Sequence, residues 1–213
     1  MILKAEDVAE RLKKGLEPEE KDPLVISPHS DIKTIRESGS ASIDLRLGTW
    51  FVKLRQARIE FLEVGQDLAE AQLAETHYVP FGEKYLLHPR SFVLGITLEW
   101  LRLPKDLSAY VIGKSSWGRR GLIIATATGV HPGFPGCLTL ELTNVGEIPI
   151  KLQPGIEICQ IFFHEVCKPV SEQIDQSQFV GSRRPKLGKI KLDKIADKLA
   201  TALAQLDENS PSP

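Results

Sequence analysis

Cysteine is scarce in this chain. The only three, Cys137, Cys159 and Cys167, are far apart, and none belongs to a C-x-x-C pair. An odd number of separated cysteines does not make a disulfide framework, and a thiolate zinc site needs closely paired ligands. The sequence therefore argues against both, and we expect all three to be small core residues.

An excess of charge of one sign is also missing. The 27 Lys and Arg residues are balanced by 28 Asp and Glu residues, which gives a formal net charge of -1. Proteins that hold nucleic acid through its phosphates carry a basic field. We therefore expect no nucleic-acid partner, and any anion site must be local.

Long hydrophobic runs are absent as well. The longest uncharged apolar stretch, residues 122–130, is far shorter than the roughly 20 residues that span a bilayer. Charged residues such as Lys4, Asp7 and Arg11 interrupt residues 1–15, where a signal peptide would be continuously apolar. We expect no membrane partner and a cytoplasmic protein.

The composition that remains is that of a globular protein. Hydrophobic residues make up 42% and charged residues 26% of the 213, which excludes disorder throughout. At about 150 residues per domain, this length allows one sizeable domain and an appendage. We place the domain at residues 1–168 and a C-terminal closing segment with a helix at residues 169–213.

Helical periodicity occurs near the two ends of the chain. Val8, Leu12 and Leu16 share one face of a short helix predicted to end at Gly15, where a helix often needs a residue tolerant of positive φ. Apolar residues at heptad-like spacing over residues 192–206 predict a second helix. We expect this helix to pack on the body of the protein. Packing against a neighbouring subunit is the weaker alternative.

Short apolar runs separated by Gly, Pro and Asn fill the middle of the chain, after a loop with brief strands expected over residues 18–40. Such runs, at this spacing, indicate an all-β sandwich or barrel. The runs are Ile43–Leu47, Phe92–Leu98, Ala109–Ile112 and Ile156–Phe163.

Strict alternation places Glu141 in the middle of a strand. Leu138, Leu140 and Leu142 point to one face and Glu141 points to the other. Pro-Gly dipeptides before this strand mark a turn, so a hairpin is predicted over residues 122–144. The carboxylate of Glu141 is either exposed on a solvated face, which the spacing favours, or held in a cleft as a general acid and base.

Residues 113–121, Gly-Lys-Ser-Ser-Trp-Gly-Arg-Arg-Gly, combine hydroxyls, backbone amides and three cations. A phosphate-binding turn uses these groups, because hydroxyls and N–H groups donate to phosphate oxygens while Arg or Lys supplies charge. The Walker pattern G-x-x-x-x-G-K-[ST] is absent. A solvated polar loop and a local anion site both remain open on composition alone.

Several motifs also occur in the order and at the intervals of a known family. They are Asp44-Leu45-Arg46-Leu47-Gly48, Leu87-His88-Pro89, Phe92-Val93-Leu94-Gly95, Thr97-Leu98-Glu99, Gly113-Lys114-Ser115-Ser116 through Arg119, Gly121-Leu122, Pro132-Gly133-Phe134 and Leu140-Glu141. Over about residues 1–165 the chain resembles the dCTP deaminase branch of the dUTPase-like superfamily. The resemblance implies a mainly β fold, a dUTPase-like distorted β-barrel or jelly-roll with a short N-terminal helix and a C-terminal helix.

The resemblance also implies a nucleotide site between the subunits of a homotrimer, with Mg²⁺ arriving on the triphosphate. In that family the turn after residue 113 binds the triphosphate, the hairpin backbone from Ala127 to His131 reads the pyrimidine and sugar, and the following strand lies beside the base. The implied nucleotide-binding residues are Lys114, Ser115, Ser116, Trp117, Gly118, Arg119, Ala127, His131, Thr139, Leu140, Glu141 and Gln160.

The implied reaction is hydrolytic deamination of dCTP to dUTP and ammonia. Glu141 would move protons while water attacks C4 of cytosine, with Ser115 and Arg119 near that water. Zinc deaminases use a His or Cys triad with P-C-x-x-C, which this sequence lacks. We therefore expect no metal ligands in the protein and no zinc.

Two departures from the family keep alternatives open. His131 stands where the family usually has aspartate, and residues 178–182 replace its closing run, Lys-Tyr-Gln-Gly-Gln. Arg183, Arg184 and Lys186 supply phosphate charge there or form a solvated basic stretch. The alternatives are a dUTP diphosphatase, a bifunctional enzyme giving dUMP, and a non-catalytic nucleotide-binding regulator; dTTP is a candidate inhibitor.

Overall fold

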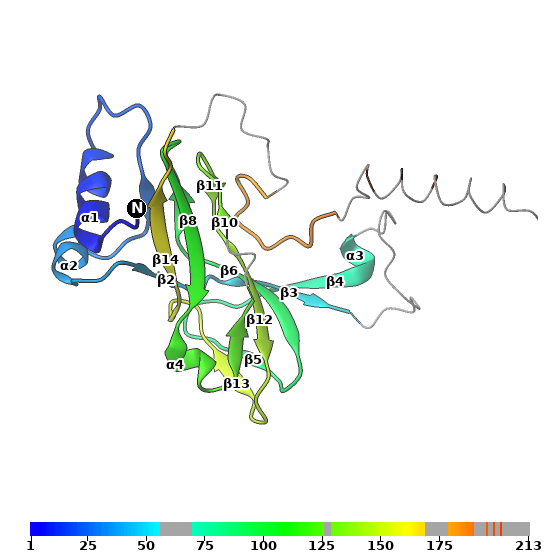
Figure 1. Ribbon diagram of the computed structural model, residues 1–213. Coiled ribbons are helices and arrows are strands. Elements are labelled where there is room, and N and C mark those ends of the chain that lie inside the picture. The colour runs from blue at the N-terminus through cyan, green and yellow to red at the C-terminus, as the bar shows by residue number, and fades with distance from the viewer. Residues whose placement is uncertain are drawn as a thin grey trace, which may run out of the picture.

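The computed structural model describes residues 1–55, 70–125, 129–168 and 179–189, together with Ile195, Lys198 and Thr201 (Figure 1). Short strands dominate these residues, which confirms the prediction of a mainly β fold. The elements are α1 (Ala5–Lys14), β1 (Val25–Ser27), α2 (Ile32–Glu37), β2 (Ile43–Arg46), β3 (Trp50–Leu54), α3 (Glu70–Leu73), β4 (Ala74–Tyr78), β5 (Tyr85–Leu87), β6 (Phe92–Ile96), β7 (Trp100–Arg102), β8 (Leu107–Gly113), α4 (Ser115–Gly118), β9 (Leu122–Ile124), β10 (Gly129–Val130), β11 (Pro135–Gly136), β12 (Thr139–Asn144), β13 (Ile150–Leu152) and β14 (Glu157–Glu165).

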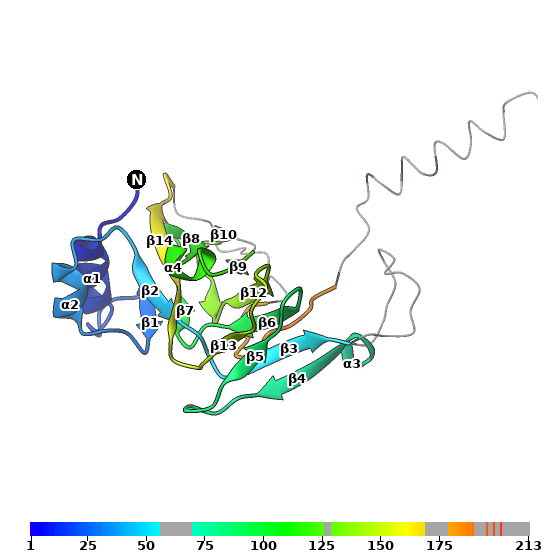
Figure 2. The same cartoon turned by 90° about the horizontal axis from the view of Figure 1, so that it is seen from below.

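The strands of the described residues form four small sheets around one main core, and a small second cluster of Val52, Ala74 and Leu94 lies on β3, β4 and β6. The strand orders of the sheets are β1-β7-β11, β10-β8-β14-β2, β4-β3-β6-β12-β9 and β13-β5, and all the pairings are antiparallel. The core contains fully buried side chains from several sheets, among them Leu45, Leu101, Leu140 and Phe163. Figures 1 and 2 agree that α1 and α2 lie at one end of the molecule and the β3–β4 hairpin at the other.

Helix α1 confirms the N-terminal helix but corrects two details. Val8 and Leu12 are buried as expected, whereas Leu16 lies beyond the helix end and is exposed. Gly15 has φ -63°, so a positive φ is not why glycine stands there. A Cβ at this position would lie 2.9 Å from the carbonyl oxygen of Leu24, which leaves room only for hydrogen.

The predicted strands are present as β2, β6, β8 and β14. The alternation around Glu141 is confirmed too, because Leu138, Leu140 and Leu142 are buried while Glu141 is half-buried on the opposite face of β12. The hairpin predicted over residues 122–144 is present only at its open end, where Leu122 on β9 pairs with Asn144 on β12. Between these strands, β10 and β11 leave the hairpin and pair with β8 and β7.

The cysteine prediction holds for two of the three residues. Cys137 and Cys159 are buried, whereas Cys167 is exposed because it follows the end of β14 and has left the core. Burial raises the pKa of the Cys159 thiol to about 12, so this sulfur is inert at neutral pH.

The described part of the C-terminal segment is attached to the body of the protein. Gly181 N donates to Pro135 O at 2.8 Å, and Cys137 N donates to Ser182 O at 3.0 Å. Ile195, Lys198 and Thr201 are helical, and the rest of the helix predicted over residues 192–206 lies outside the described residues. The boundary at residue 168 stays a prediction. Among the helices described, none is both long and apolar enough to cross a membrane.

Candidate nucleotide site

The turn that the sequence singled out forms α4, directly after β8. Lys114 N donates to Ile158 O at 3.1 Å, and Lys114 O accepts from the backbone N–H groups of Trp117 at 3.0 Å and Gly118 at 3.2 Å. Trp117 Nε1 donates to Glu157 O at 3.0 Å. The main chain of β14 therefore fixes both the start and the middle of the turn.

The hydroxyls and the two arginines of this turn are exposed. Ser115, Ser116, Arg119 and Arg120 all face solvent, and Arg120 Nη1 donates to Ser116 O at 2.7 Å. A fixed turn that presents two hydroxyls and two cations has the groups that bind an anion.

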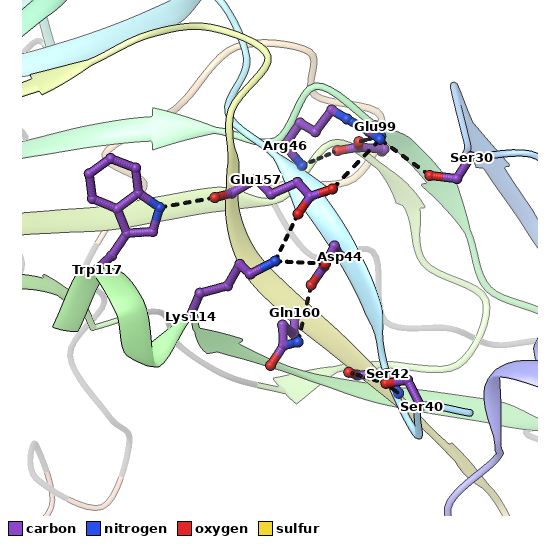
Figure 3. A network of polar contacts seen from close by, with 10 residues as sticks. All are labelled: Ser30, Ser40, Ser42, Asp44, Arg46, Glu99, Lys114, Trp117, Glu157 and Gln160. Carbon is purple, nitrogen blue, oxygen red and sulfur yellow. Dashed lines mark hydrogen bonds and ion pairs between the residues drawn. The ribbon is translucent and has the colours of Figure 1, made fainter. Parts of the chain in front are cut away.

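Lys114 belongs to a network that connects this turn to two strands (Figure 3). Its Nζ donates to Asp44 Oδ2 at 2.7 Å and to Glu157 Oε2 at 2.8 Å. Gln160 Nε2 donates to Asp44 Oδ1 at 3.1 Å. The structure thus brings together Lys114 and Gln160, two residues predicted from sequence. Their link is Asp44, the first residue of the family-like motif at residues 44–48, which was not among the predicted site residues.

The network continues into the core as a chain of alternating charges. Arg46 Nη2 lies 4.0 Å from Glu157 Oε1, and Arg46 Nη1 donates to Glu99 Oε1 at 3.1 Å. Arg46 N also donates to Glu99 Oε2 at 2.8 Å, and Arg46 Nη2 donates to Ser30 Oγ at 3.2 Å. Glu99 is 1% exposed, so the chain ends on a carboxylate enclosed by the protein.

The pKa values of these groups follow from burial and pairing. Burial acts to raise the pKa of the Asp44 carboxyl, but the hydrogen bonds from Lys114 and Gln160 outweigh burial and the pKa is lowered. Burial acts to lower the pKa of Lys114, but Asp44 and Glu157 outweigh it and the pKa is raised. At Glu99 burial prevails over Arg46, and the pKa of this carboxyl is raised.

Glu141 lies on β12, between β6 and β9. Its main chain pairs with Leu94, and its carbonyl oxygen accepts from Ala125 N at 2.9 Å. The side chain is half-buried, and no ion pair or side-chain hydrogen bond holds it within the described part of the chain. A carboxylate of this kind is available to a ligand.

Within one chain, no hydrogen bond or ion pair between described residues joins Glu141 to Ser115 or Arg119. The sheet register explains the separation. Leu122 follows the turn and pairs with Asn144, whereas Glu141 lies opposite Ala125. Glu141 is three residues from Asn144 on β12, so at about 3.4 Å per residue it lies roughly 10 Å along the sheet from the pair that follows the turn.

The remaining predicted residues have varied positions. His131 is exposed after β10, and Thr139 is half-buried beside Glu141. Leu140 faces the core, so only its main chain is on the side of a ligand. Ala127 lies outside the described residues.

The described part of the closing segment lies against β3 rather than α4. Arg184 stacks over the Trp50 ring, with its Cζ 4.0 Å from the ring centroid. Arg183 is among the residues that line a hollow of about 450 Å³, together with Trp50, Trp100 and Cys137. Arg184 stays exposed while it stacks on this ring, and Arg183 and Lys186 are exposed too, which agrees with a solvated basic stretch. Phosphate binding by these residues stays a prediction.

A solved structure represents the class of mainly β proteins to which this fold belongs. It is the 2′-deoxycytidine 5′-triphosphate deaminase of Agrobacterium tumefaciens, which superimposes with a TM-score of 0.54 at 24% identity, over 76% of this chain and 47% of the solved chain. The chain thus spans about half the length of that protein.

The sequence comparison gives the family. Residues 2–166 match the family model described as dCTP deaminase-like, and the chain belongs to that family. It is 35% identical to the dCTP deaminase of Natronomonas pharaonis over 201 residues, 91% of this chain and 97% of that protein. It is 39% identical to the "dCTP deaminase, dUMP-forming" of Dictyoglomus thermophilum over 170 residues, 79% of this chain and 82% of that protein. The resemblance found in the sequence is confirmed.

Proposed function

We propose that this protein is a dCTP deaminase that converts dCTP and water to dUTP and ammonia without zinc. The observation that carries the proposal is the half-buried carboxylate of Glu141, which has no protein partner among the described residues, in a chain whose residues 2–166 match this family. The names of the two relatives support the same substrate.

The proposed chemistry uses Glu141 as a proton carrier. Water is a poor nucleophile at neutral pH, so Glu141 accepts a proton from it as its oxygen bonds to C4 of cytosine. Glu141 returns this proton to the ring nitrogen, then takes the second proton from the new C4 hydroxyl and passes it to the amino group. The C4–N bond breaks, ammonia leaves and the C4 carbonyl of uracil forms. Such a transfer contributes about 10² to 10⁴-fold to the rate. The Ser115 hydroxyl and the Arg119 guanidinium stabilise the charge that develops on the attacked carbon's oxygen.

In the proposed complex, Mg²⁺ arrives on the triphosphate. Ser115, Ser116 and Arg119 bind the phosphates, with the backbone of Trp117 and Gly118 completing the turn. His131 hydrogen-bonds the sugar, Thr139 and the main chain of Leu140 flank the base, and Ala127 reads it. Gln160 contacts the nucleotide from β14.

We further propose that the active unit is a homotrimer with sites between subunits. Two observations support it: Glu141 and the α4 turn lie apart within one chain, and β8 exposes large apolar side chains. Tyr110 is 48% and Ile112 is 55% exposed on that strand, beside the exposed Ile123 of β9. A second copy would cover this face and bring its own turn to Glu141. A cytoplasmic location and the lack of nucleic-acid and membrane partners remain predictions.

The product is tested by incubating the purified protein with dCTP, and separately with dUTP, in the presence of Mg²⁺ and resolving the products by ion exchange. We expect dUTP and ammonia from dCTP, because His131 replaces the carboxylate that the diphosphatase mechanism uses. The relatives named dUMP-forming favour a bifunctional enzyme as the second candidate. Release of dUMP and pyrophosphate would establish it.

Recovery of both nucleotides unchanged from a protein that binds them would instead support the non-catalytic regulator. Adding dTTP to the same assay tests inhibition. We expect slower turnover at fixed dCTP, because thymine and cytosine nucleotides share the sugar and triphosphate that the site binds.

A further inference from the structure

Two carboxylates from different strands enclose Lys114. Asp44 lies on β2 and Glu157 begins β14, and their oxygens lie 2.7 and 2.8 Å from Lys114 Nζ (Figure 3). An ammonium group has three N–H donors. Two of them are directed at these carboxylates, which leaves one donor for a further acceptor.

Each carboxylate is itself held in place. The second oxygen of Asp44 accepts from Gln160 at 3.1 Å. The second oxygen of Glu157 lies 4.0 Å from Arg46, which is bound to the buried Glu99. The direction of the remaining N–H donor is therefore set by groups anchored in the core rather than by a mobile side chain.

The charge balance limits what Lys114 does for an anion. One ammonium between two carboxylates carries a net charge of -1 over the three groups, so the cluster attracts a triphosphate weakly. Attraction at long range comes from Arg119 and Arg120, which form no ion pair among the described residues. The contribution left to Lys114 is a directed hydrogen bond.

Glu157 is also connected to the turn through its main chain. Its carbonyl oxygen accepts from Trp117 Nε1 at 3.0 Å, in the middle of α4. Lys114 O, at the start of the turn, accepts two of its backbone hydrogen bonds. Glu157 therefore has two roles: its carboxylate orients the ammonium of Lys114, and its carbonyl oxygen helps to fix the turn.

We propose that Asp44 and Glu157 are positioning residues for triphosphate binding. They direct the third N–H of Lys114 toward the anion that the Ser115 and Ser116 hydroxyls also bind. The inference rests on the proposed function, because that function supplies the triphosphate.

The test compares two substitutions of Asp44. Asp44→Asn keeps an oxygen that accepts from the ammonium, whereas Asp44→Ala removes it. We expect Asp44→Ala to raise KM for dCTP about tenfold, the loss of one charge-assisted hydrogen bond, with little change in kcat. Asp44→Asn should stay close to the wild-type KM. The double variant Asp44→Ala/Lys114→Met should be no weaker than Lys114→Met alone, since Asp44 acts through Lys114.

Glu165→Ala is the matched control for Glu157→Ala. Both glutamates lie on β14 and both side chains are 45% exposed, but Glu165 is at the far end of the strand. We expect Glu157→Ala to raise KM as Asp44→Ala does, and Glu165→Ala to leave KM unchanged. Thermal melting of every variant confirms that it is folded.

Three outcomes would overturn the inference. Lower KM in both Asp44 variants would mean that the carboxylate only repels phosphate. If the increase in KM of the double variant equalled the product of the increases in the two single variants, Asp44 and Lys114 would act independently. If kcat of the Asp44 variants fell together with the change in KM and the variants also melted at a lower temperature, Asp44 would have a general structural role.

Calorimetric binding of inorganic tripolyphosphate to the same variants separates this inference from the proposed function. If the wild type leaves dCTP unchanged but binds tripolyphosphate, and Asp44→Ala weakens that binding about tenfold, the deaminase proposal fails and the positioning role stands. If dCTP is deaminated and neither variant changes KM or tripolyphosphate binding, only the positioning role fails.

Discussion

At the scale of single residues, Glu141 combines two properties that rarely occur together in a carboxylate, partial burial and the lack of a neutralising partner. It is half-buried in a sheet, yet no described residue neutralises it. A carboxylate that loses water without gaining a partner raises the free energy of the empty site. A substrate that supplies hydrogen-bond donors removes that cost, and the amino group of cytosine and the attacking water are such donors.

Glu141→Gln removes the proton carrier and keeps the shape of the side chain. We expect turnover of dCTP to fall at least about 10²-fold while calorimetry still detects dCTP binding. Glu147→Gln is the matched control, because Glu147 is exposed in the turn after the same strand, and it should keep full activity. Full activity in Glu141→Gln would contradict the assignment.

Asp44 makes stability depend on acid. Burial opposes ionisation, but Lys114 and Gln160 prevail and the pKa of the folded protein is lowered. The unfolded chain therefore binds the proton more tightly. The stabilisation by Asp44 is full above its ordinary pKa of about 3.9 and is lost as the pH falls through the lower folded value.

We expect melting temperatures measured from neutral pH down to about pH 3 to fall more steeply in the wild type than in Asp44→Asn, which has no proton to gain. The difference should be small, because the Asp44 side chain is a third exposed and solvent screens the pair. Parallel curves would contradict the cause assigned to this shift.

At the scale of elements, α1 illustrates a glycine that is required by packing. Ala at position 15 would suit φ -63°, and on backbone entropy alone it would stabilise by about 0.4 to 1 kcal/mol. Its Cβ would instead meet Leu24 O at 2.9 Å. We expect Gly15→Ala to lower the free energy of unfolding by about 1 kcal/mol, measured by urea denaturation. Gly118→Ala meets nothing within 4 Å and should not destabilise.

Elements with a strong local pattern were predictable from sequence, and short ones were not. Alternation located β12 and the face of Glu141, because side chains of a strand alternate wherever one face is buried. Helix α2 was missed within a predicted loop. Its six residues contain only one buried side chain, Ile35, and its signal was Asp31, whose carboxylate accepts from Thr34 N at 3.4 Å.

The candidate site was predictable in its members but not in its contacts. The sequence named Lys114 and Gln160, yet the partners of Lys114 are 70 and 43 residues away along the chain. Nothing local indicates that strands β2 and β14 become neighbours. The position of Arg184 on Trp50 depends in the same way on tertiary structure.

At the scale of the whole molecule, the exposed face of β8 decides whether the proposed site is complete. We expect sedimentation to show a trimer for the wild type and a smaller species for Ile112→Lys, because a buried lysine at an apolar interface loses its hydration. Ile148→Lys is the control, since Ile148 is 77% exposed on the turn between β12 and β13. It should stay trimeric and active. A wild-type monomer with full activity would contradict a site shared between subunits.

The register of β12 also constrains how this gene can vary. One face of the strand carries Leu140 and Leu142 into the core, and the other carries Glu141. Inserting or deleting a single codon here would exchange the two faces, so that leucines would meet water and a carboxylate would enter the core. Length variation among natural relatives should therefore concentrate in the turns on either side of this strand and spare the strand itself.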